Sequence, residues 1–117
     1  MRAELKCLHC PNIDDLENWS PGDEPFGIFV QAMIGPSDGP GEESFNLTVC
    51  TPEWFAAHKM GNGIVMGSRT LFVSRYDYRM IKAYLERAAQ RAEGNSWREI
   101  AEGLSWLGEW EFENYRP

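Results

Sequence analysis

The chain has 117 residues, of which 43% are hydrophobic and 25% charged, and its formal net charge is −7. These proportions predict one folded globular domain spanning residues 1–117, and they exclude an intrinsically disordered chain and a small scaffold stapled by disulfides. Its apolar runs fall short of the ~18 residues that cross a bilayer, and its N-terminus lacks a signal-peptide pattern. With an odd number of cysteines, we expect a cytoplasmic protein with free thiols and no membrane contact.

Charge is unevenly distributed along the chain. Residues 1–58 hold ten acidic residues against two basic ones, and residues 93–117 hold six against two, whereas residues 59–92 hold seven basic residues against two acidic ones. Binding to nucleic acid needs lysines and arginines clustered on one face, so this balance disfavours a nucleic-acid ligand. It suits a basic protein partner, although acidity that serves only solubility gives the same balance.

The first predicted element is an outer strand over residues 3–9, whose alternation puts Leu5, Cys7 and His9 on one face. Residues 12–25 follow as an acidic stretch that contains no basic residue and is interrupted by prolines and glycine. Such a composition predicts an irregular loop.

Two further strands are predicted next. Residues 26–34 are apolar at both odd and even positions, which is typical of a central strand. A loop rich in glycine and proline separates them from residues 44–49, which alternate with a period of two, as in a strand with one wet face. We expect these two strands to form a hairpin.

The middle of the chain predicts a helix, a strand and a longer helix. Thr51 is suited to cap the first helix and Pro52 to occupy its first position. Residues 70–74 are typical of a short buried strand. The longer helix begins after Ser74 or Asp77, and most of the positive charge of the chain lies on its solvated face.

The last elements are a third helix and a terminal strand. Ser96 and Glu99 have the spacing of a capping box, and Gly108 is well placed to end the helix. Residues 109–113 alternate strictly and predict a strand. The whole pattern predicts an α+β fold, with an antiparallel or mixed sheet of about five strands and three helices packed mainly on one face.

The chain offers little for catalysis. It has two histidines and no nucleophile elbow, phosphate-binding loop or zinc-protease motif. Cys7, His9 and Cys10 are ligand types that suit zinc, but their spacing puts Cys10 off the face that the other two share, and no second pair follows. We therefore predict no catalytic residue, no metal site and no cofactor.

Two acidic patches are the candidate binding sites. Alternate carboxylates of the terminal strand lie roughly 6.6–7 Å apart when extended, and they repel one another unless a cation is near. The candidate residues are Asp14, Asp15, Glu17, Trp19, Asp23 and Glu24 in the first patch and Glu109, Glu111 and Glu113 in the second. Trp19 is the candidate anchor, whereas Trp97 and Trp110 are expected in the core. Protection of a strand edge and a solvated turn explain the same charges without a partner.

A resemblance to a known family is spread over nearly the whole chain. It resides in Ala3-Glu4-Leu5-Lys6 with His9-x-Pro11-x-Ile13, in residues 26–36, in Glu43-Ser44-Phe45 through Val49-Cys50-Thr51-Pro52-x-Trp54, and in Trp110-Glu111-Phe112-Glu113-x-Tyr115. Together these segments resemble immunity protein family 8 of bacterial polymorphic-toxin systems. The resemblance implies a small α+β protein with a characteristic tryptophan, Trp54 or Trp110, that is encoded beside a toxin and neutralises it.

We therefore expect an inhibitory binding protein and not an enzyme. Its partner is the C-terminal domain of a cognate toxin, expected to be a basic nuclease whose active site the acidic surface covers. One alternative is a small metal-assisted hydrolase that uses Asp14, Asp15 and either His9 or His58. Another is an adaptor that binds a peptide on a sheet edge.

Overall fold

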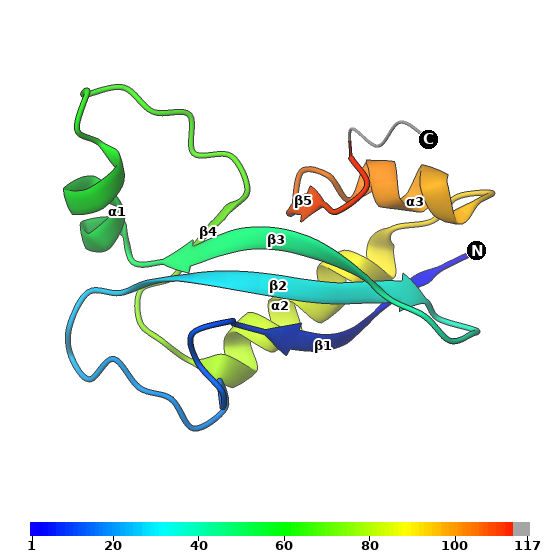
Figure 1. Ribbon diagram of the computed structural model, residues 1–117, viewed down its shortest axis with the longest axis horizontal. Helices are drawn as coiled ribbons and strands as arrows, with labels where there is room; N and C mark the ends of the chain where they lie inside the picture. The colour runs from blue at the N-terminus through cyan, green and yellow to red at the C-terminus, as the bar shows by residue number, and fades with distance from the viewer. Residues whose placement is uncertain (114–117) are drawn as a thin grey trace.

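Three long strands form the frame of a mixed five-stranded sheet in the computed structural model, which describes residues 1–113 (Figure 1). They run antiparallel in the order β1-β2-β3. The other edge of β3 is shared by two short strands, β4 in parallel and β5 in antiparallel orientation. The strands are β1 (Ala3–His9), β2 (Gly27–Pro36), β3 (Glu43–Cys50), β4 (Thr70–Phe72) and β5 (Glu109–Trp110).

Each of the three helices begins at a side chain that accepts a hydrogen bond from the first turn. The helices are α1 (Pro52–Lys59), α2 (Tyr78–Arg91) and α3 (Trp97–Gly103), with Thr51, Asp77 and Ser96 as their respective N-caps. The caps satisfy amides that have no partner within the helix, which is why these residue types start helices. The predicted α+β fold and its order of elements are confirmed.

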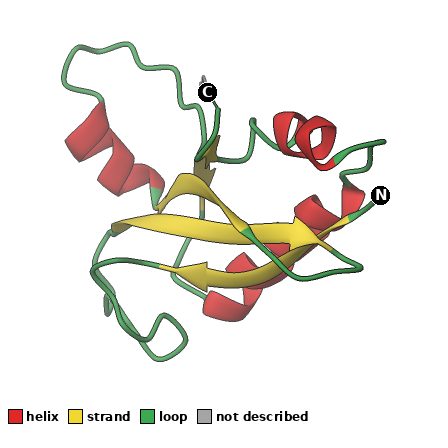
Figure 2. Ribbon diagram, turned by 45° about the vertical axis from the view of Figure 1, so that its right-hand side comes forward, coloured by secondary structure: helices red, strands yellow, loops and turns green. Residues whose placement is uncertain are grey.

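The hydrophobic core lies on one face of the sheet. Alternate residues of β2 and β3 are buried there, among them Val30, Ile34 and Phe45. Helix α2 crosses behind the sheet and adds Leu85, while α3 lies beside β5 (Figure 1; Figure 2). The opposite face of the sheet is less covered, and the side chain of Phe29 in β2 is exposed there.

Helix α1 stands apart from this core, at the end of β3 (Figure 2). None of its residues is buried. Its Trp54 covers Gly27, where an added β-carbon would lie 2.2 Å from the indole ring. Glycine at the start of β2 therefore makes room for the tryptophan that docks α1.

Among the helices within residues 1–113, none combines the length and the apolar character needed to span a membrane.

The side chains of β1 point to different faces of the sheet from those predicted. The register with β2 shifts between Leu5 and Cys7, so the alternation restarts one residue later. Leu8 packs against the core, whereas Cys7 is exposed. The prediction that Leu5, Cys7 and His9 share one face is wrong, because a bulge is not encoded in the period-two pattern.

The two short strands are shorter than predicted. Strand β4 ends at Phe72, which is exposed, so the predicted buried strand over residues 70–74 is only partly correct. Strand β5 ends at Trp110, because Glu111 binds both backbone groups of Ser44. Its amide donates to the Ser44 carbonyl and its carboxylate accepts from the Ser44 amide at 2.7 Å. The side chain thereby replaces the next backbone bond of the ladder.

Glu43 joins the sheet to the C-terminal part of the chain. Its Oε1 atom accepts hydrogen bonds from the indole nitrogens of Trp97, at 2.6 Å, and of Trp110, at 2.9 Å. Both tryptophans pack against the core, as predicted, and a buried indole needs an acceptor for its N–H. One carboxylate oxygen thus satisfies two aromatic residues from α3 and β5.

We predict that Glu43→Ala destabilises the protein by about 2 kcal/mol, because it leaves two indole N–H groups without an acceptor. Glu43→Gln keeps an acceptor oxygen and should cost about 1 kcal/mol or less. The neighbouring exposed Glu42→Ala is the control, with an expected change within about 0.5 kcal/mol. Urea unfolding measures all three, and equal effects for the two residue-43 variants contradict the assignment.

Candidate protein-binding surfaces

The first acidic patch lies on the long irregular loop that joins β1 to β2, as predicted. In Figure 1 this loop extends beyond one end of the sheet. All five of its carboxylates are exposed: Asp14, Asp15, Glu17, Asp23 and Glu24. The structure therefore brings the five acidic residues of the first patch to one end of the molecule. We call the segment that carries them, residues 12–25, the acidic loop.

Aromatic packing fixes the middle of the acidic loop. The ring of Trp19 meets that of Tyr76 edge to face at a centroid distance of 4.8 Å, and Phe26 contacts both rings. The Tyr76 hydroxyl donates a hydrogen bond to the Leu16 carbonyl, and the Leu16 side chain is buried. Trp19 is half-buried in this cluster, so it holds the loop in place; its role as an anchor for a partner stays a prediction.

Two pKa shifts follow from this arrangement. Hydrogen bonds from the side-chain and backbone amides of Asn18 lower the pKa of the Asp15 carboxyl. Burial raises the pKa of Tyr76 to about 12, with smaller contributions from Tyr78, Cys10 and Asp15. At neutral pH, Asp15 is therefore ionised and the Tyr76 hydroxyl keeps the proton that it donates to Leu16.

A hollow of about 190 Å³ opens beside the acidic loop. Asp23 and Glu24 line it from the loop, and Glu53 lines it from the first turn of α1. Arg75 also reaches this hollow but pairs with Asp77 at 3.7 Å. A hollow bordered by three carboxylates suits the cationic end of a lysine or arginine side chain.

Glu53 is a member of this site that the sequence did not predict, since its position in the chain is that of the first turn of a helix. Backbone bonds that close the end of the sheet bring it there. The Thr51 amide donates to the Phe26 carbonyl at 2.9 Å, and the Phe26 amide donates to the Thr51 hydroxyl. The sequence predicts the hairpin but not its continuation to residues 26 and 51, and this continuation places the start of α1 beside the end of the loop.

The second patch has a different geometry from the predicted row of carboxylates. Because β5 ends at Trp110, Glu113 folds back and binds Arg69, with 2.6 Å between Oε1 and Nη2. Glu109 lies 3.8 Å from the same guanidinium, and Glu111 is bound to the Ser44 amide. The extended row over Glu109, Glu111 and Glu113 is therefore wrong, and these three carboxylates already have partners within the protein.

The possible metal ligands do not form a cluster. Within residues 1–113, no group of three or more histidine, cysteine or acidic side chains is arranged to hold a metal ion. His58 stacks on Trp54, and its Nδ1 lies 3.0 Å from the Trp54 carbonyl oxygen. Burial raises the pKa of the Cys50 thiol and, with help from Glu42, that of Cys7, which disfavours the reactive thiolate.

Comparison with known proteins gives one family. The family model described as immunity protein 8 matches residues 3–115, which is nearly the whole chain. Curated proteins and solved structures gave no match. The family match covers both acidic patches and the elements that position them.

We predict that Tyr76→Phe loosens the acidic loop, because the Leu16 carbonyl loses its donor at a cost of about 1 kcal/mol. Hydrogen exchange of residues 14–19 should be faster than in the wild type. Tyr84→Phe, whose hydroxyl has no hydrogen-bond partner within residues 1–113, is the control. Unchanged exchange in Tyr76→Phe contradicts the role of the hydroxyl.

The same residue predicts a response to alkaline pH. Since the folded pKa of Tyr76 is raised from 10.0 to about 12, its contribution to stability is complete below pH 10 and declines as the pH rises through about 12. Urea unfolding across this window should show a steeper loss for the wild type than for Tyr76→Phe. Parallel curves contradict the shift.

Proposed function

Because the chain belongs to the immunity protein 8 family, we propose that it neutralises a cognate toxin by covering the toxin's active site with the acidic loop. The family consists of immunity proteins of bacterial polymorphic-toxin systems, so the partner is a toxin protein. Inhibition of this kind requires binding and no catalysis by the immunity protein.

The state of the carboxylates favours the acidic loop over the second patch. Within residues 1–113, Asp14, Glu17, Asp23, Glu24 and Glu53 have no ion pair or hydrogen bond through their carboxylates. Their charge is therefore free to meet lysines and arginines of a partner. The carboxylates of the second patch are engaged with Arg69 and Ser44, and binding a partner there would first break these contacts. This contrast is the observation that carries the proposal.

Rigidity of the loop supports tight binding. The aromatic cluster of Trp19, Phe26 and Tyr76 and the buried Leu16 hold the loop before any partner arrives. A pre-ordered loop loses less conformational entropy on association than a loose one. Its exposed charges also accelerate the encounter with a surface of opposite sign.

We propose that the toxin is a basic nuclease. An enzyme that binds the phosphate backbone presents clustered lysines and arginines at its active site. An anionic loop that enters such a site competes with the phosphates for the same cationic groups. The chemistry that supports this proposal is charge complementarity, with the hollow beside Glu53 as the place for one cationic side chain.

The test uses the toxin domain encoded beside this gene. We predict that Asp23→Lys/Glu24→Lys weakens its binding at least about tenfold, mainly through slower association, because two attractive charges become repulsive. Asp38→Lys/Glu42→Lys is the matched control, since it makes the same charge change on the exposed hairpin loop between β2 and β3. Surface plasmon resonance measures both rates, and growth of toxin-producing cells measures protection.

Two results contradict this mechanism. One is equal affinity of the two double variants, which makes net charge, and not the acidic loop, the determinant. The other is binding that does not weaken at high salt. Salt screens exposed charges and so weakens a complex formed through the acidic loop, whereas it has much less effect on a peptide that pairs with the outer edge of β1.

A further inference from the structure

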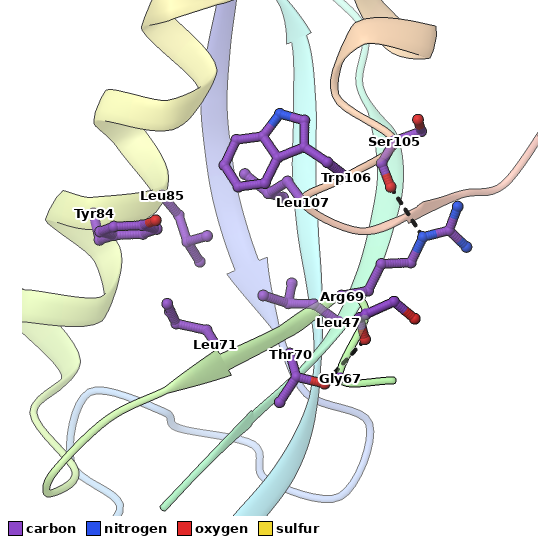
Figure 3. Close-up of a pocket in the computed structure, with 11 residues that line it drawn as sticks. Leu47, Gly67, Arg69, Thr70, Leu71, Tyr84, Leu85, Ser105, Trp106 and Leu107 are labelled. Atoms are coloured by element: carbon purple, nitrogen blue, oxygen red, sulfur yellow. Dashed lines mark hydrogen bonds between the residues drawn. The ribbon is translucent and has the colours of Figure 1, made fainter. Parts of the chain in front are cut away.

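A second surface of different character lies on the side of the molecule where α2 faces β4 and residues 105–107. A groove of about 560 Å³ lies there, and Figure 3 shows the residues that line it. Tyr84 and Leu85 face it from α2, Leu71 from β4, and Trp106 and Leu107 from the segment that leads to β5. None of these residues belongs to the acidic loop.

The groove exists because β3 has two short neighbours on one edge. Strand β4 pairs with residues 48–50, and β5 pairs with residues 45 and 46. Leu47 lies between the two pairings, so its buried side chain forms part of the groove floor together with Leu85 and Leu107. The floor is thus formed by buried side chains at the margin of the hydrophobic core.

Two large aromatic residues that line the groove are exposed to solvent. Trp106 is 60% exposed and Tyr84 is 43% exposed. Trp106 and Tyr84 also line an adjoining hollow of about 290 Å³, so the two depressions share both aromatic residues. Exposed tryptophan and tyrosine beside an apolar depression are the residue types that contribute most to binding at protein interfaces.

The charge of this surface is opposite to that of the acidic loop. Arg87 and Arg91 of α2 line the adjoining hollow together with Trp106 and Tyr84. Neither arginine forms an ion pair or hydrogen bond within residues 1–113, whereas Arg69 on the far wall is bound to Glu113. Two free guanidinium groups on α2 therefore line the hollow that adjoins the groove.

We propose that this groove binds a protein segment that carries a large apolar side chain next to an acidic residue. The apolar side chain fills the groove above Leu47, Leu85 and Leu107 and packs on Trp106. The carboxylate pairs with Arg87 or Arg91. Two free arginines on a chain with a net charge of −7 do not suit nucleic acid, whose binding depends on many phosphate contacts.

This inference rests on the proposed function in one respect, namely that the segment belongs to the bound toxin domain. A toxin held at the acidic loop through its cations and at the groove through a carboxylate is oriented by two contacts of opposite sign. A homologous toxin that lacks either contact would meet unpaired charge, so the groove contributes to selectivity among toxins.

The first experiment tests the groove without the toxin. A library of short random peptides displayed on phage is selected on the wild type and, in parallel, on Trp106→Ala/Arg91→Glu. We expect peptides enriched only on the wild type to combine a large apolar residue with a nearby aspartate or glutamate. The same enrichment on both proteins, enrichment of basic peptides, or no enrichment on the wild type overturns the proposal.

The second experiment uses the toxin domain and a matched set of variants. We predict that Trp106→Ala weakens binding about 30-fold and Arg87→Glu/Arg91→Glu about tenfold. Arg79→Glu/Lys82→Glu changes the charge of the same helix outside the groove and should leave affinity within about threefold. Circular dichroism checks that each variant is folded, which is expected because the substituted side chains are largely at the surface.

The outcomes separate the two proposals. Full affinity of the groove variants for the toxin domain, with loss in the acidic-loop variant, overturns the groove as a toxin contact and leaves the proposed function standing. No binding of the wild type to the toxin domain overturns the proposed function, while the peptide selection still decides whether the groove takes an acidic and apolar segment. Binding of oligothymidylate that Trp106→Ala abolishes assigns the groove to nucleic acid and overturns the proposal.

Discussion

The pairing of β3 on both of its edges is the constraint on which the rest of the structure depends. One edge is fully used by β2, and the other is divided between β4 and β5, two strands that come from distant parts of the chain. Its inward side chains form the centre of the core, and Glu43 at its start binds the indoles of α3 and β5. The interruption between β4 and β5 falls at Leu47, whose buried side chain forms part of the groove floor.

The acidic loop illustrates how a surface can be both irregular and ordered. It has no regular hydrogen-bonding ladder, yet Leu16 and the rings of Trp19, Phe26 and Tyr76 attach it to the core. Apolar groups supply the order, and the carboxylates between them remain in water. Immunity proteins act by binding. A charged surface that apolar packing already orders loses little conformational entropy when it binds a partner.

The two proposed surfaces differ in the physics of recognition. Exposed carboxylates on the loop act at a distance and mainly affect the rate and salt dependence of association. The groove acts at contact, through Trp106, Tyr84 and the exclusion of water from an apolar floor. A partner that satisfies both must match a pattern of charge and shape, which is a stricter requirement than opposite net charge.

The sequence by itself determined the order and type of the elements, the N-caps of α1 and α3, the buried face of β3 and the exposure of the acidic loop, since these depend on local periodicity and on residue chemistry within a few positions. It left the N-cap of α2 open between Ser74 and Asp77, did not distinguish the two faces of β2, and placed the end of α3 at Gly108, whereas the helix ends at Gly103. Family membership was also evident from the sequence. Only the tertiary structure decided the bulge in β1, the early end of β5, the pairing of Glu113 with Arg69 and the meeting of Glu53 with the loop. Each of these depends on a contact between residues far apart in the chain, and a pattern of neighbours carries no record of such contacts.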